Sequence, residues 1–153
     1  MNKATLIVRC SRIDKGRYAY AATILCGGAA LASIESVTEA SGMVEANIIG
    51  MRDVILDVVD SNGFGGVVRL VISHTSPDVI LALNGVTYKG EFDPAAERVV
   101  DEIYDLTEEA GVEIDFSIFR TNGRNGAVAL VKSRKLAEQS KNITYDYEVS
   151  SDE

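Results

Sequence analysis

The sequence predicts an α/β fold with a mixed five-stranded sheet and helices on its faces. Two observations indicate this architecture. The first forty residues contain three apolar segments separated by short turns, which is typical of an antiparallel meander. From residue 41 onward, segments of helical period alternate with segments rich in β-branched residues. The full order is strand–strand–strand–helix–strand–helix–helix–strand–helix.

The three N-terminal strands are predicted at "ATLIVRCS" (residues 4–11), "YAYAATILC" (18–26) and "AALASIESVTEA" (29–40). The turn "RIDKGR" joins the first two strands, and the pair "GG" turns the chain before the third. Arg9 is unexpected, because it places a charge in a strand that otherwise has the composition of a buried one.

A helix is predicted from Ser41, its N-cap, to Asp60. Its apolar residues are spaced by four, three, four and three positions and therefore form one face. These residues are Val44, Ile48, Met51, Ile55 and Val58. The β-branched segment "VVRLVIS" at 67–73 then predicts a buried strand that is parallel to a neighbour.

The second half of the chain predicts a short helix near Pro77, a long helix at 93–111, a strand at 112–119 and a helix at 127–141. Asp93 is the predicted N-cap of the long helix. The apolar stripe of this helix is Ala96, Val99, Val100, Ile103 and Leu106. We expect its acidic side chains to form a solvated face.

Length and composition indicate one globular domain at 1–140, followed by an acidic tail at 141–153. The chain has 153 residues, 46% of them hydrophobic, and residues 3–140 contain neither a repeat nor a linker. No segment approaches the ~18 uncharged apolar residues that span a bilayer. The N-terminal apolar run is short and is interrupted by Arg9, unlike a signal peptide. We therefore expect a cytoplasmic protein.

Charge and cysteine content exclude several classes of function. The net charge of −8 argues against strong non-specific binding to nucleic acid. Cys10 and Cys26 are expected to be reduced, because two cysteines do not make a disulfide framework. One histidine and no cysteine–histidine spacing argue against zinc. We expect no cofactor.

Five segments resemble motifs of the ribonuclease H family. "VRCS" and "YAATIL" are similar in type and spacing to the "TDGS" and "GYGAIL" segments of its first two strands. "GMVEANIIGM" places Glu45 where the first helix of the family carries a "MEL" glutamate. "SHTSPDV" and "RTNGRNGAVALV" resemble the "TDS" and "GHxGNxxAD" segments. The resemblance covers about residues 3–138 and implies a ribonuclease H-like fold.

The resemblance also implies chemistry that the residues do not carry over. The family cleaves RNA with two metal ions held by four carboxylates, which such ions require as hard oxygen ligands. The corresponding positions here fall on Arg9, Glu45, Thr75 and near Ala129, with Asn125 keeping a preceding polar position. An arginine at ~4 Å repels each unit of metal charge by about 4 kcal/mol at an effective dielectric of 20. We expect no catalytic residue at these positions, and the three missing carboxylates argue against enzyme activity.

Two arrangements of the remaining polar residues are open. If the strand and helix positions face each other, Arg9 pairs with Glu45 and replaces the metal as counterion. Alternatively, Arg9 points to the other face of the sheet, or the register slips by one residue. Glu45, His74 and Asp78 are a less favoured single-metal site, because a lone histidine after a strand is more often a hydrogen-bonded structural group.

Basic residues in two loops define a candidate nucleic-acid surface. They are Arg12, Lys15 and Arg17 in the first hairpin and Arg120 and Arg124 in the last loop, joined by Lys132, Arg134 and Lys135. The alternative is a scatter of solvated charges, and no aromatic residues interleave with them to stack on bases.

The sequence therefore predicts an inactive ribonuclease H-like protein that binds a protein partner as a regulator, adaptor or inhibitor, such as phages encode. One alternative is a nucleic-acid-binding module without cleavage. Another is a nuclease with a rearranged metal site. The oligomeric state is left open.

Overall fold

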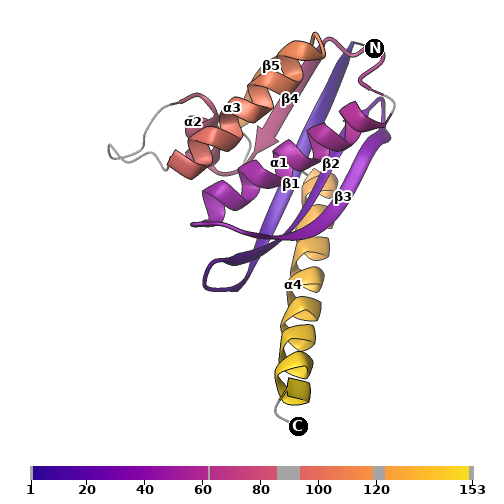
Figure 1. The fold of residues 1–153 in the computed structure, drawn as a ribbon. Helices are drawn as coiled ribbons and strands as arrows, with labels where there is room; N and C mark the ends of the chain where they lie inside the picture. The colour runs from indigo at the N-terminus through magenta and orange to yellow at the C-terminus, as the bar shows by residue number, and fades with distance from the viewer. Residues whose placement is uncertain (1, 62, 86–93, 119–122, 152–153) are drawn as a thin grey trace.

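The computed structural model describes residues 2–61, 63–85, 94–118 and 123–151; the side chains of Pro94, Ile118 and residues 142–151 lie outside this description. Five strands form one sheet in the order β3-β2-β1-β4-β5, with helices on both faces (Figure 1), as the sequence predicts. The strands are β1 (Lys3–Asp14), β2 (Arg17–Cys26), β3 (Ala29–Glu39), β4 (Arg69–His74) and β5 (Glu113–Ile118). The helices are α1 (Met43–Asp60), α2 (Pro77–Leu83), α3 (Pro94–Glu109) and α4 (Gly123–Ser151). Among the described residues, no helix is long and apolar enough to cross a membrane.

The first three strands form the predicted antiparallel meander. β1 pairs with β2 and β2 pairs with β3, both antiparallel. β4 is parallel to β1 on one side and to β5 on the other, which confirms its predicted position inside the sheet. β1 is therefore the central strand.

The alternation of side chains along β1 separates two cores. Its even-numbered residues Leu6, Val8 and Cys10 join the large core beneath α1 and α3. The odd-numbered Ile7 and Ile13 join two small clusters with Ala129 and Ala137 of α4. Figure 1 shows the same layers, with α1 and α3 in front of the sheet and α4 behind it. The predicted apolar faces of α1 and α3 are confirmed, because Ile48, Met51, Ile55, Val58, Ala96, Val99, Val100 and Ile103 are buried.

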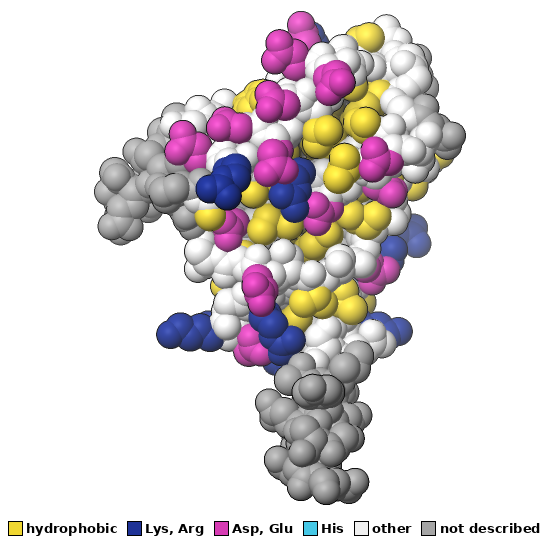
Figure 2. All heavy atoms as spheres, in the orientation of Figure 1, with side chains coloured by type: hydrophobic (Ala, Val, Ile, Leu, Met, Phe, Trp, Pro, Cys, Tyr) yellow, Lys and Arg dark blue, Asp and Glu magenta, His cyan; other side chains and the backbone are white. Residues whose placement is uncertain are grey.

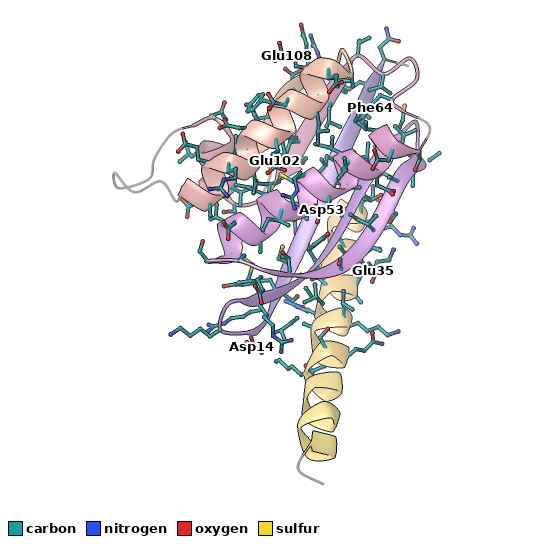
Figure 3. The ribbon with its side chains drawn as sticks, in the orientation of Figure 1. Asp14, Glu35, Asp53, Phe64, Glu102 and Glu108 are labelled. Atoms are coloured by element: carbon teal, nitrogen blue, oxygen red, sulfur yellow. The ribbon has the colours of Figure 1, made fainter. Side chains whose placement is uncertain are left out.

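α1 packs very closely on the sheet at Gly50. A β-carbon at this position would lie 2.9 Å from Cγ2 of Val8 and 3.0 Å from Cδ1 of Tyr20. Tyr20 extends past the helix, and its hydroxyl donates to the carboxylate of Asp53. Arg52 then links Asp53 to Glu102 of α3, with N–O distances of 3.0 and 3.2 Å (Figure 3).

Two helix starts and one helix end differ from the sequence prediction. Gly42, not Ser41, is the N-cap of α1. α4 starts at Gly123, inside the predicted loop, and continues to Ser151 through the segment predicted as a tail. The reason for its length is local, because residues 127–151 contain neither proline nor glycine. The predicted N-cap Asp93 lies outside the described residues.

We predict that Gly50→Ala destabilises the protein. Alanine raises helix propensity by about 1 kcal/mol, but the added methyl group forces Val8 or the Tyr20 ring to move. Overpacking of this kind costs about 1–3 kcal/mol, so we expect a lower urea midpoint. Gly66→Ala is the control, because nothing lies within 4 Å of a β-carbon there. An unchanged midpoint for Gly50→Ala would show that this contact does not limit the packing of α1.

Candidate functional site beside strands β1 and β4

The site that the sequence singles out lies where β1 and β4 stop pairing. Their parallel register runs from Lys3–Arg69 to Ile7–Ser73 and ends there. Arg9 follows two residues later on β1, and His74 and Thr75 follow on the β4 side. The carboxyl-terminal end of a parallel strand pair is a common place for a functional site, because the strands separate and leave side chains accessible.

Arg9 lies on the face of the sheet that α4 covers. Its register partner in β2 is Ala21, which packs with Ile7 and Ala129 of α4. The side chain is half-buried, and Nη1 donates a hydrogen bond to the carbonyl of Val8 at 2.9 Å. Burial lowers the pKa of Arg9, because the charged form loses hydration.

The predicted ion pair between Arg9 and Glu45 is wrong. No carboxylate oxygen lies within 4.0 Å of the Arg9 guanidinium among the described residues. Glu45 belongs to α1, on the opposite face of the sheet, and its Oε1 accepts the backbone N–H of Ser41 at 2.7 Å. This contact is similar to one half of a capping box, in which a glutamate in the first turn reaches back to the start of its helix.

His74 is buried and uses both ring nitrogens. Nδ1 accepts the backbone N–H of Ser76 at 2.9 Å, so Nε2 carries the proton and donates to Oδ1 of Asn47 at 2.9 Å. Asn47 in turn donates to the carbonyl of Met43 at 2.8 Å. Desolvation, helped by the positive charge of Arg9, lowers the pKa of His74 to about 4. His74 is therefore neutral and joins β4, the start of α2 and the first turn of α1.

The other positions that the resemblance assigns carry no carboxylate. Thr75 is half-buried just after β4, and Ala129 is buried in α4 against Ile7. The alternative set of Glu45, His74 and Asp78 does not assemble into a metal site, because no group of three or more such ligands occurs among the described residues. Cys10 is buried, which raises the pKa of its thiol to about 12 and keeps it unreactive.

The first hairpin lies beside the later part of α4, where Ile13 packs against Ala137, and not beside Arg124. Arg17 makes a bidentate contact with Asp14, Arg12 donates to the backbone carbonyl of Asp14, and Lys15 is exposed. Lys141 of α4 lies near enough to the first hairpin for its charge to lower the pKa of Asp14. Arg124, at the start of α4, lies about 25 Å along the helix from Lys141. Arg120 lies outside the described residues. Figure 2 shows the opposite, α1–α3 face, where the predicted acidic side chains of α3 are exposed to solvent.

The outward face of α4 combines cations with exposed valines. Ala129, Ser133 and Ala137 are buried against the sheet. The exposed residues of the same helix include Arg124, Val128, Val131, Lys132, Arg134 and Lys135. Val131 is 62% exposed and Val128 is 45% exposed. We call these six residues the α4 outer face; the exposed Glu138 lies beside them on the helix.

Sequence reasoning missed Asn47 and the Tyr20–Asp53 contact. Asn47 sits in a helix between buried apolar residues, and a polar residue there signals a buried hydrogen bond. Tyr20 carries no comparable signal, because its hydroxyl contact depends on how α1 crosses β2. Burial and the hydrogen bond to Asp53 raise the pKa of Tyr20, so it remains protonated.

We predict that His74 makes the protein less stable in mild acid. Its folded pKa of about 4 lies below the ordinary 6.5, so the unfolded chain binds the proton more tightly. The stability contribution is complete above pH 6.5 and is lost as the pH falls toward 4. Between pH 7 and 5, wild type should lose about 2 kcal/mol more than His74→Gln in urea unfolding. Equal losses in the two proteins would contradict a buried neutral His74.

Comparison with known proteins finds similarity in structure alone. No protein-family model matches the sequence, and no curated protein matches it. The N-terminal RNase H domain of rv2228c from Mycobacterium tuberculosis is similar with a TM-score of 0.67 and 15% identity, over 92% of this chain and 99% of that chain. LC11-RNase H1 in complex with an RNA/DNA hybrid gives 0.72 and 13%, over 90% and 98%. RNase H1 from Halobacterium salinarum gives 0.66 and 15%, over 90% and 98%.

These structures match this chain over nearly their whole length, at a sequence identity that indicates the fold alone. The chain has a ribonuclease H-like fold.

Proposed function

We propose that this protein is a catalytically inactive ribonuclease H-like domain that acts by binding a protein partner, as a regulator, adaptor or inhibitor. One observation carries the proposal. The position that the resemblance assigns to the first metal-binding aspartate holds Arg9, a half-buried cation. The assigned positions Thr75 and Ala129 also lack a carboxylate.

The residues present do not fit a pair of divalent ions. Two such ions bring four positive charges and need several carboxylates to offset them. Glu45 is the one carboxylate at the assigned positions, and it is buried and engaged by the Ser41 N–H. His74 cannot substitute for a ligand without giving up its bond to Asn47 or Ser76. Arg9 adds electrostatic repulsion, so these residues do not support metal-dependent cleavage.

The α4 outer face supports a protein partner. Val128 and Val131 are more exposed than most apolar side chains in this chain, and four cations surround them. Exposed apolar residues with a charged rim are typical of protein interfaces. The rim charge is positive although the chain carries −8 overall, so it complements an acidic partner surface.

A nucleic-acid-binding module is the second candidate. The same four cations on α4 favour it, because phosphate contacts provide most of the affinity for nucleic acid. LC11-RNase H1, which has the same fold, was solved in complex with an RNA/DNA hybrid. The exposed valines and the absence of a described aromatic stacking platform weigh against this candidate.

We predict that the purified protein does not cleave an RNA/DNA hybrid with Mg²⁺ or Mn²⁺, and that titration with either ion gives no heat of binding. The reason is the shortage of carboxylates and the charge of Arg9. An Arg9→Asp/Thr75→Asp double variant, which restores two acidic residues, should bind Mn²⁺ measurably. Metal-dependent cleavage by wild type that disappears in Glu45→Gln would overturn the proposed function.

We predict that substitutions on α4 separate the two binding candidates. A protein interface should lose affinity for its purified partner with Val131→Asp and keep it with Val68→Asp, a control at another exposed valine. A nucleic-acid surface should instead respond to Lys132→Gln/Lys135→Gln, with the log–log salt slope smaller by about two. We expect no hybrid binding at about 50 mM salt, and steep salt-dependent binding would favour the second candidate.

A further inference from the structure

We infer that Arg9 is the recognition site for a carboxylate group of the partner protein. The inference rests on the proposed function. If a divalent ion were bound beside β1, that ion, and not Arg9, would attract the carboxylate. At this place the resemblance implies carboxylates that bind metal cations. Here the site holds a cation, and its ligand would be a carboxylate.

Among the residues that the structure describes, most donors of the Arg9 guanidinium have no hydrogen-bond partner. It carries five N–H groups, and one hydrogen bond is formed, to the carbonyl of Val8. The other two half-buried arginines behave differently, since Arg17 pairs with Asp14 and Arg52 pairs with Asp53 and Glu102. Arg9 is therefore the half-buried arginine of the described residues that lacks a carboxylate partner.

Holding this charge without a counterion costs stability. A partly buried cation loses hydration that an opposite charge normally offsets, and burial lowers the pKa of Arg9 accordingly. The charge also acts on His74, whose pKa it lowers. Among the described residues Arg9 has no ion pair in return. A carboxylate that arrives with a partner would supply a counterion and two acceptors for the guanidinium fork.

Charge balance favours a carboxylate over a phosphate. Both groups match the guanidinium fork, but a phosphate dianion calls for more than one cation. His74 is neutral, with both ring nitrogens in hydrogen bonds, so it adds no positive charge beside Arg9. A single guanidinium balances a single carboxylate, from an Asp or Glu side chain or a chain terminus.

His74 provides a direct readout, because it is the single histidine of the chain. A carboxylate at Arg9 would cancel part of the positive charge that lowers the pKa of His74. Binding should therefore raise that pKa, and a merely structural arginine would show no such response. Trifluoroacetate is a suitable probe because it stays ionised throughout the titration.

The experiment follows the His74 ring signals of the full chain by NMR. The first experiment adds acetate at pH 7, with chloride at the same ionic strength as the control. The second experiment measures the pKa of His74 by acid titration, once in trifluoroacetate and once in chloride. We expect saturable acetate binding and a higher His74 pKa in trifluoroacetate. Arg9→Gln should bind acetate about tenfold more weakly and abolish the trifluoroacetate effect. Arg9→Lys, which keeps the charge without the fork, should fall between, and the exposed Arg12→Gln should match wild type.

Three results would overturn the inference: no saturable acetate binding, equal loss of binding in Arg12→Gln, or tighter binding of inorganic phosphate than of acetate at matched ionic strength. Further arms with N-acetylated aspartate amide and with a peptide that has a free carboxyl terminus distinguish a side chain from a chain end. If acetate does not bind at Arg9 and the protein does not cleave the hybrid, the carboxylate inference is wrong but the proposed function is not contradicted. Cleavage of the hybrid would overturn the proposed function independently.

Discussion

Strand β1 is covered on both of its faces, and this constraint organises the molecule. Its even-numbered side chains enter the core beneath α1 and α3, and its odd-numbered ones meet α4. Because successive side chains of a strand point to opposite faces, the register of β1 determines which helix each residue meets. The close approach of α1 at Gly50 and the small residues of α4 both match this two-sided burial.

The same alternation explains which contacts the polar residues at the site make. Arg9 is directed to the α4 side, while Glu45 belongs to a helix on the other side, so the two cannot neutralise each other. Glu45 instead satisfies a backbone N–H before α1, and His74 holds the β4–α2 turn against Asn47. These groups stabilise local structure, whereas Arg9 has no carboxylate partner in the part of the chain that the structure describes.

α4 gives the molecule an unequal distribution of charge. Its inner face is small and packs on β1, whereas its outer face carries four cations and two exposed valines. The chain as a whole has a net charge of −8, and α3 displays many of its acidic side chains. An acidic partner is attracted by the cations of α4 and by Arg9, while the acidic α1–α3 face repels it. The proposed protein-binding role and the proposed carboxylate site thus agree in the sign of the partner.

The sequence by itself determined the order of the strands and helices, the apolar faces of α1 and α3, and the absence of carboxylates at Arg9, Thr75 and Ala129. Periodicity and residue type are local properties, so one chain suffices to read them. Only the tertiary structure decided on which face Arg9 lies, what Glu45 and His74 contact, and how closely α1 approaches Tyr20. Those contacts join segments far apart in the chain, and a shift of one residue in the β1 register would have reversed the outcome.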